Sequence, residues 1–287
     1  MTFLLQSIER ILSALPLPAA LRLGRGLGGL LGSVIRYHRA DAEDALRRAF
    51  PDADARWVRE TARRCYAHLG MNLVESLRLR RAGRAYVADR VAWSGIETLR
   101  RALEGGRGAC LLTAHTGNWE LACATAPVFG LPLTIVVKPI KGRALDAHVA
   151  AVRQAFGLQT LPSRGSYRDC RRTLRDNGLL GFVLDQNMTR DEGVFVDFLG
   201  RPACTTAGLA HLAAVARAPV VPVFAERLDG GRHVIHVLPA LEPPADTEPE
   251  TLRAATQVYT RAIEDFIRAH PDQWIWLHRR WRTRPPA

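Results

Sequence analysis

The spacing of apolar residues divides the chain into a helical first third and a mixed remainder. Over residues 1–90 the apolar positions recur every three or four residues, which is the period of an amphipathic helix. Asp54 precedes the longest of these patterns and has the side chain of a helix N-cap. The helices that we expect in this region cover Phe3–Leu15, Ala19–Tyr37 and Ala55–Arg81.

From Val91 onward, short apolar runs alternate with helical patterns of about 10–15 residues. The expected strands are Ala109–Ala114, Leu133–Val137, Leu179–Leu184, Val194–Phe198, Val220–Ala225 and Val234–Leu238. The expected helices are Ile96–Glu104, Trp119–Phe129, Leu145–Phe156, Tyr167–Asp176, Thr206–Arg217 and Thr251–Ala269. This alternation predicts an α/β fold with a mostly parallel central sheet flanked by helices. We expect two regions: a helical one over residues 1–90 and an α/β domain over residues 91–287.

The first two helical patterns are too often interrupted by charge to cross a bilayer. A spanning helix needs about 20 largely apolar residues, whereas Glu9, Arg10, Arg22, Arg25 and Arg36 break this stretch. A cleaved signal peptide fits poorly, since no positive charge precedes the first leucines. Two interpretations are left: amphipathic helices that lie in a membrane interface, or helices whose apolar side packs on the rest of the protein.

Charge and cysteine content narrow the class of protein. The formal net charge is +12, with 40 Lys and Arg against 28 Asp and Glu, so we expect anionic partners, either nucleic acid or a phosphate-rich membrane surface. The five scattered cysteines form no Cys-x-x-Cys pair, and we expect buried, reduced thiols. His233 and His236 should point to opposite faces of a strand. We therefore expect neither a metal site nor a cofactor.

The segment Gly24–Gly29 has the spacing Gly-x-Gly-x-x-Gly, but it does not predict a dinucleotide site. It follows a helical pattern rather than a strand, and it has no suitably placed acidic residue downstream. Gly24, Gly28 and Gly32 recur every four residues and therefore share one helix face. Such a face favours close packing on another helix, or a shallow seam that faces lipid.

The candidate chemistry lies in His115-Thr116-Gly117-Asn118-Trp119-Glu120, at the end of an apolar strand. Residues five apart on one continuous helix point about 140° apart. His115 and Glu120 can therefore meet only if the helix begins after His115, with Thr116 or Asn118 as its cap. We expect the Glu120 carboxylate to hold the imidazole, and the start of the helix to keep His115 neutral so that it can accept a proton.

These residues resemble the His-x-x-x-x-Asp/Glu signature of the lysophospholipid acyltransferase superfamily, and more closely its lipid A biosynthesis (late) acyltransferase family. The resemblance extends over nearly the whole chain. It includes three further blocks and a C-terminal run, which are Arg48–Pro51, Phe198–Thr205, Ala218–Pro222 and Gln273–Trp281. By this resemblance His115 is the general base and Glu120 its partner. The resemblance places Asn118, Arg164, Asp185, Gly200 and Thr205 around the substrates.

The resemblance implies transfer of a fatty acyl chain from acyl carrier protein or acyl-CoA to a hydroxyl of a lipid A precursor or similar anionic glycolipid. Asp185-Gln186-Asn187-Met188-Thr189 departs from the Pro-Glu-Gly-Thr block of glycerolipid acyltransferases, which favours a glycolipid acceptor. We expect direct transfer without an acyl-enzyme, with an oxyanion held by backbone N–H groups near Gly117 and Asn118.

The expected place of such an enzyme is the cytoplasmic face of the inner membrane, as a peripheral or monotopic protein. Trp274, Trp276 and Trp281, among arginines, suit a membrane interface, or else they pack in the protein. Three alternatives are a phosphatidylinositol mannoside or other polar-lipid acyltransferase, a non-catalytic lipid-binding protein, and a basic nucleic-acid-binding protein. No recognisable nucleic-acid-binding module is present in the sequence, so we expect no nucleic acid partner.

Overall fold

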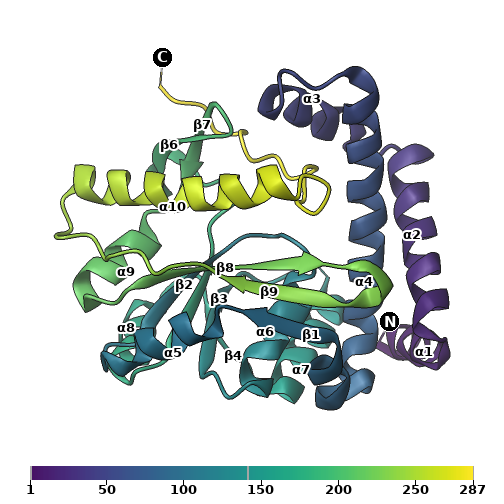
Figure 1. The fold of residues 1–287 in the computed structure, drawn as a ribbon, viewed down its shortest axis with the longest axis horizontal. Helices are drawn as coiled ribbons and strands as arrows, with labels where there is room; N and C mark the ends of the chain where they lie inside the picture. The colour runs from purple at the N-terminus through teal and green to yellow at the C-terminus, as the bar shows by residue number, and fades with distance from the viewer. Residues whose placement is uncertain (1, 141, 287) are drawn as a thin grey trace.

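The central sheet has seven strands and is almost entirely parallel (Figure 1). The structure is a computed structural model that describes residues 2–140 and 142–286. The strand order is β1-β9-β8-β2-β5-β3-β4, and within the described part of this sheet β8 and β9 form the one antiparallel pair. The strands are β1 (Val91–Ser94), β2 (Ala109–Thr113), β3 (Leu133–Val137), β4 (Gln159–Pro162), β5 (Leu179–Val183), β8 (Val220–Arg227) and β9 (His233–Val237). The predicted α/β class is confirmed.

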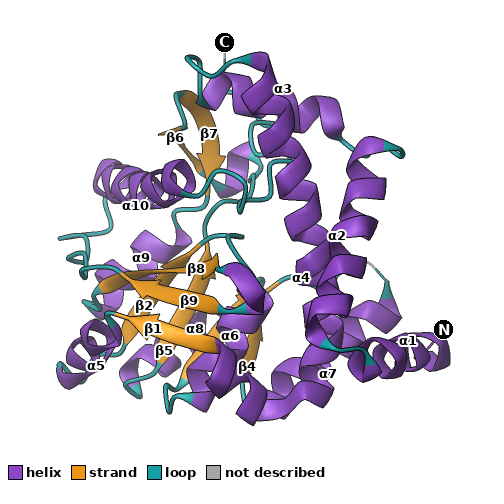
Figure 2. Cartoon of the chain, turned by 45° about the vertical axis from the view of Figure 1, so that its right-hand side comes forward, coloured by secondary structure: helices purple, strands orange, loops and turns teal. Residues whose placement is uncertain are grey.

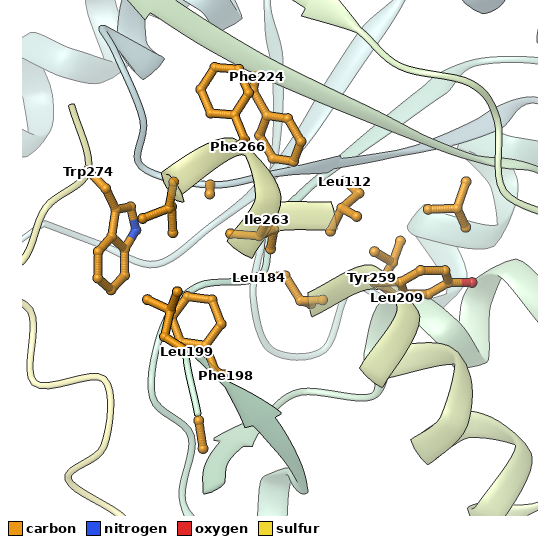
Figure 3. Packing of buried hydrophobic residues seen from close by; sticks show 14 of the residues in the cluster. Leu112, Leu184, Phe198, Leu199, Leu209, Phe224, Tyr259, Ile263, Phe266 and Trp274 are labelled. Carbon is orange, nitrogen blue, oxygen red and sulfur yellow. The ribbon is translucent and has the colours of Figure 1, made fainter. Parts of the chain in front are cut away.

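Helices cover both faces of this sheet. The helices are α5 (Ile96–Glu104), α6 (Trp119–Val128), α7 (Arg143–Phe156), α8 (Tyr167–Arg175), α9 (Gly208–Ala216) and α10 (Pro249–Ala269). Alternate residues of β2 enter different cores: Cys110 and Leu112 pack with α8, α9 and α10, whereas Ala109 and Leu111 pack with α5, α6 and α7. Figure 3 shows the first of these cores, with Leu112 facing the side chains of α10.

The strand predicted at Val194–Phe198 is confirmed, but it lies outside the central sheet. This segment is a strand, β6, but it pairs antiparallel with β7 (Arg201–Thr205) in a separate hairpin and does not join the central sheet. The strands β1, β4 and β7 were not predicted. β1 and β4 are four residues long and lie at the two edges of the sheet, where a short strand carries little apolar pattern.

The first region contains α1 (Thr2–Ala14), α2 (Leu17–Ser33), α3 (Arg39–Ala49) and α4 (Ala55–Arg90). Asp54 caps α4 by accepting a hydrogen bond from the backbone N–H of Trp57 at 2.6 Å, as predicted. The predicted second helix was too long, because α2 ends at Ser33 and Arg36 and His38 adopt left-handed backbone angles. α4 passes beside the sheet, and α2 lies on its far side (Figures 1 and 2).

Glycine allows α2 and α4 to pack backbone against backbone. A Cβ atom on Gly28 would lie 1.9 Å from the carbonyl oxygen of Tyr66, and one on Gly70 would lie 2.0 Å from that of Gly24. No side chain fits in such gaps. The glycine face is buried against α4, which confirms close helix packing and rules out a lipid-facing seam at these glycines.

The opposite face of α2 is exposed and apolar. Leu23, Leu27, Leu30 and Val34 lie along it. None of the helices in the described residues combines the length and the apolar character required to traverse a bilayer.

The two predicted regions share a core. Ala42, Leu46 and Val58 of the first region belong to the same buried cluster as Leu112 and Phe224 of the sheet. α4 ends at Arg90 and β1 begins at Val91. The division into two domains at this point stays a prediction.

Candidate active site

Two neighbouring strands place His115 and Asp185 side by side. β2 and β5 are parallel and aligned with Thr113 opposite Val183, and each of the two residues lies two positions beyond the end of its strand. His115 Nδ1 is 2.9 Å from Asp185 Oδ1, and the backbone N–H of His115 donates to Asp185 Oδ2 at 2.8 Å. Because a carboxylate can only accept, Nδ1 carries the ring proton and the lone pair is on Nε2.

Asp185 is held as an ionised, buried carboxylate. It is 2% exposed, and a third hydrogen bond comes from the Trp274 indole N–H at 2.7 Å. Burial alone would raise the pKa of Asp185, but the charge and hydrogen bonds of His115 and the indole donor outweigh it and hold the pKa well below the usual range. The negative charge therefore persists beside the imidazole.

The carboxylates of Asp185 and Glu120 raise the pKa of His115. Burial pulls the pKa of His115 down, but the Asp185 charge and hydrogen bond, with a further contribution from Glu120, raise it above its ordinary value. The direction is the opposite of the one expected from the helix start alone. An imidazole in this setting accepts a proton readily and is stabilised once charged.

Glu120 does not bind the imidazole, and the predicted His115–Glu120 hydrogen bond was wrong. Both oxygens of Glu120 are taken by Arg153 of α7, with Arg153 Nη2 at 2.7 Å from Oε1 and Nε at 3.2 Å from Oε2. A guanidinium offers two parallel donors to a carboxylate, which an imidazole cannot match. Glu120 still acts on His115 through its charge, as the raised pKa records.

The helix boundary that the prediction required is confirmed. α6 begins at Trp119, and Asn118 Oδ1 accepts a hydrogen bond from the N–H of Leu121 at 3.2 Å. His115 is therefore outside the helix, in front of its N-terminus. The Trp119 indole meets the imidazole edge to face, with ring centroids 5.1 Å apart.

A cavity of about 610 Å³ opens in front of His115. This volume is within the range of small-ligand sites, about 300–1,000 Å³. His115, Glu120, Arg153 and Gln186 lie in the wall and interact with one another, and we call this part of the cavity its polar end. The rest of the wall is mainly apolar and comes from both faces of the sheet, with Leu111, Leu133, Ile135, Phe182, Leu212, Val223 and Phe224 among its residues. The volume and the lining fit a hydrocarbon chain that ends in a reactive polar group.

The other predicted substrate-binding residues lie outside this cavity wall. Asn118 is buried and its side-chain amide donates to Glu75. The Arg164 side chain is 85% exposed and paired with Glu192 at 2.8 Å. Gly200 forms the β6–β7 turn with a φ of 74°. Thr205 is buried, and its hydroxyl accepts a hydrogen bond from Arg280. Their roles in binding stay predictions.

The C-terminal segment contributes more to the site than the sequence pattern indicated. Trp274 and Trp276 are each 1% exposed, so their predicted place at a membrane interface was wrong and the packing alternative is confirmed. His278 stacks near His115, with ring centroids 6.5 Å apart. Arg280 is fully buried and donates to the carbonyl oxygens of Gln186 at 3.1 Å and Cys204 at 2.7 Å.

Arg153, Gln186 and Arg280 were missed from the sequence. Gln186 adjoins Asp185 and its amide nitrogen lies 3.4 Å from His115 Nε2, so its position after β5 was a usable signal. Arg153 and Arg280 are two of the many arginines in this chain, and no local pattern distinguishes them from the others.

A histidine that a buried carboxylate holds in one orientation, in the wall of a mainly apolar cavity of an α/β fold, is an arrangement that suits transfer of an acyl chain. The profile of the bacterial lipid A biosynthesis acyltransferase family matches residues 1–283 of this chain. The chain belongs to that family, and the protein is an acyltransferase.

The chain is similar to phosphatidylinositol mannoside acyltransferases and to lipid A biosynthesis acyltransferases. The phosphatidylinositol mannoside acyltransferase of Mycobacterium tuberculosis (strain CDC 1551 / Oshkosh) is 31% identical over 198 residues, which is 67% of this chain and 60% of the relative. The lipid A biosynthesis acyltransferase of Haemophilus influenzae is 23% identical over 96% of this chain and 85% of the relative. The lipid A biosynthesis lauroyltransferase of Escherichia coli K12 is 27% identical over 94% and 88%. The aligned part therefore spans less than two thirds of the mycobacterial protein.

Proposed function

We propose that this acyltransferase moves a fatty acyl chain from the thioester of acyl carrier protein or coenzyme A to a hydroxyl of a lipid A precursor or a similar anionic glycolipid. The observation that carries the proposal is the His115–Asp185 pair at the polar end of the apolar cavity. The cavity holds the acyl chain, and its polar end holds the thioester beside the imidazole.

In the proposed reaction His115 is the general base. Its Nε2 takes the proton of the acceptor hydroxyl as that oxygen attacks the thioester carbonyl, and Asp185 stabilises the imidazolium that forms. The tetrahedral intermediate then collapses, the C–S bond breaks, and the proton on Nε2 passes to the departing thiolate. The products are an ester and a free thiol, and His115 is neutral again.

The oxyanion needs donors other than the Gly117 N–H. That group donates to the carbonyl oxygen of Gln273 at 3.0 Å, so the expectation for this amide was wrong. We assign the role to the Gln186 side-chain amide, which lies in the cavity wall, and to the N–H groups of Trp119 and Glu120 at the start of α6, since the N–H of Leu121 is bound to Asn118.

Direct transfer without an acyl-enzyme is supported by the state of the nearby thiols. Cys123 and Cys170 line the cavity, and burial raises the pKa of both, that of Cys123 to about 12. A protonated thiol is a poor nucleophile. Rapid quenching during turnover should yield no covalent acyl-protein, and isolation of an acylated cysteine or serine would overturn this part of the proposal.

We place the membrane contact on α1 and α2, at the cytoplasmic face of the inner membrane. The exposed apolar face of α2 is flanked by Arg22, Arg25 and Arg36, an arrangement that suits an interface of acyl chains and phosphates. The donor approaches elsewhere. Arg168, Arg171, Arg172 and Arg175 are exposed on α8, which lies on the opposite side of the molecule from α2 in Figure 1, and they would attract an acidic carrier protein.

A second candidate function is acylation of a phosphatidylinositol mannoside. It is favoured by the 31% identity to the mycobacterial enzyme that carries that name. Both candidates use the same base and the same cavity, and they differ only in the polar lipid that presents the hydroxyl.

The experiment that separates these candidates is an assay of the purified protein in vesicles that contain either a lipid A precursor or a phosphatidylinositol mannoside. Each mixture receives acyl carrier protein or coenzyme A thioesters, and the lipids are read by mass spectrometry. We expect a mass increase of one acyl chain on the lipid A precursor. Acylation of the mannoside alone favours the second candidate, and no acylation with any pair supports a non-catalytic lipid-binding protein.

A further inference from the structure

The loop between His115 and α6 is held from behind by a buried group of polar residues. We call Asn72 and Glu75 of α4, Arg227 of β8 and Asn118 the Glu75 network. All four are buried, and none of them lies in the wall of the cavity in front of His115. They therefore do not contact a substrate there.

The network binds the loop at two consecutive residues, Gly117 and Asn118. The side-chain amide of Asn72 donates to the carbonyl oxygen of Gly117 at 2.5 Å, and that of Asn118 donates to Glu75 Oε2 at 2.8 Å. Asn72 and Glu75 are three residues apart and so share one face of α4. One face of a long helix thus fixes both the backbone and the side chain of the loop that follows the base.

The backbone of Gly117 is also held in place by other parts of the protein. Its φ is 52°, and a Cβ atom there would lie 2.3 Å from the carbonyl oxygen of Ala225 in β8. Its own N–H is bound to Gln273 O at 3.0 Å. The loop backbone is therefore enclosed by α4, β8 and the C-terminal segment.

Arg227 makes a buried carboxylate possible at this point. Its guanidinium reaches Glu75 Oε1 at 3.0 Å, Glu75 Oε2 at 2.5 Å and Asn72 Oδ1 at 2.6 Å. Burial pushes the pKa of Glu75 up, but His233 and Arg227 outweigh it and lower the pKa to about 2, so the pair stays charged. A buried ion pair often stabilises a fold no better than apolar residues of similar volume. Because the Glu75–Arg227 ion pair lies against the loop that follows His115, a role in positioning that loop is favoured over a role in stability.

We propose that the Glu75 network positions the catalytic loop, so that Asn72, Glu75 and Arg227 set the rate of acyl transfer without touching substrate. This rests on the proposed role of His115 as base. It also ties the loop to α4, the helix on which α2 packs, so the helix that we place at the membrane is linked to the catalytic loop through α4.

The first test is Asn118→Ser. Serine keeps an N-cap oxygen for α6 but is too short to reach Glu75. We expect kcat to fall about tenfold with KM within about threefold, because displacement of reacting groups by about 1 Å can cost as much as 100-fold. An unchanged kcat in a folded variant would contradict the proposal.

The second test replaces the ion pair as a unit, with Glu75→Leu and Arg227→Met together. The double change removes both buried charges together, but Asn72, Asn118 and His233 lose partners, so we expect a folded variant with a lowered melting temperature. The loop loses its acceptor, and kcat should fall about 10- to 100-fold. A stable double variant with full kcat would show that the network is only structural. If the double variant does not fold, the decision rests on Asn118→Ser.

The matched control is Glu9→Gln. Glu9 is also a fully buried carboxylate of the helical region, paired with Arg80 at 2.9 Å, but it lies away from the loop. It should lower stability and leave kcat unchanged. His115→Ala is assayed in parallel: activity there would refute the proposed base, whereas an inactive His115→Ala beside fully active network variants would refute the positioning role alone.

Discussion

The two sides of the His115 imidazole differ in what their carboxylates do. On the Nδ1 side, Asp185 is buried behind the ring and accepts three hydrogen bonds, two from His115 and one from Trp274. On the cavity side, Glu120 is partly exposed in the wall and its oxygens are bound to Arg153. One carboxylate is enclosed by the protein and the other faces the space for substrate.

The two carboxylates therefore affect the His115 imidazole in different ways. Both carboxylates raise the pKa of His115, but only Asp185 also fixes the direction of the ring and its tautomer. Loss of Asp185 should therefore remove a geometry, whereas loss of Glu120 should remove only a charge and free an arginine.

The largest effect should follow from His115→Ala. Because this variant has no imidazole to accept the proton of the acceptor hydroxyl, kcat/KM for acyl transfer should fall about 10⁴-fold. That value is at the upper end of what general base catalysis contributes. The measurement is initial rate with a defined thioester donor and acceptor. A melting temperature close to that of the wild type is the control for folding, and residual activity within about tenfold of the wild type would remove His115 from the role.

Asp185→Asn should have the next largest effect, about 10³-fold in kcat. The amide cannot stabilise the imidazolium and lets the ring take the other tautomer, a change that is very costly in histidine–carboxylate pairs. Trp274→Phe is a milder companion variant, since it removes one of the three hydrogen bonds to the carboxylate and leaves the charge. If Asp185→Asn and Trp274→Phe lose the same activity, the charge has no special part.

Glu120→Gln should cost less, about tenfold in kcat/KM. It leaves the His115–Asp185 hydrogen bonds in place, removes a charge that raises the pKa of His115, and leaves Arg153 without its ion-pair partner in the cavity wall. The acid limb of the pH profile should move to lower pH. A loss as large as that of Asp185→Asn would show that the cavity-side carboxylate takes a direct part in the chemistry.

The smallest effect on chemistry should come from the exposed face of α2. Leu27→Glu should weaken binding to anionic vesicles about tenfold, as measured by co-sedimentation. The change replaces an apolar side chain that would be buried in the membrane interface by a charge that the lipids repel. Val258→Glu on α10 is the matched control, since Val258 is 46% exposed and Leu27 45%. Equal losses in the two variants would argue against α2 as the membrane-facing element.

The sequence predicted most of the helices and strands whose apolar pattern was long enough to have a period, although α3 was not among the expected helices. β3 and α5 were predicted residue for residue, because each is bounded by residues that end a pattern. It could not predict that Val194–Phe198 pairs with Arg201–Thr205, since a five-residue apolar run does not specify its partner.

The site was predictable only as far as local spacing reached. His115 and the start of α6 follow from one short block of sequence. The choice between Asp185 and Glu120 as the partner of the ring depended on the pairing of β2 with β5, about 70 residues apart, and on an arginine of α7 that occupies Glu120. The tryptophans of the C-terminal run were misjudged for the same reason, because their burial depends on Phe198 and Phe50 elsewhere in the chain.

The most direct test of the account is the pH dependence of kcat/KM for the wild-type enzyme between about pH 5 and about pH 8. His115 must be neutral to accept the proton, and its pKa lies above the ordinary value. We predict a rate that rises about tenfold per pH unit on the acid side and levels off only above the usual pKa of a histidine. A rate that is flat across this range, or that falls as the pH rises, would contradict a histidine base held by Asp185.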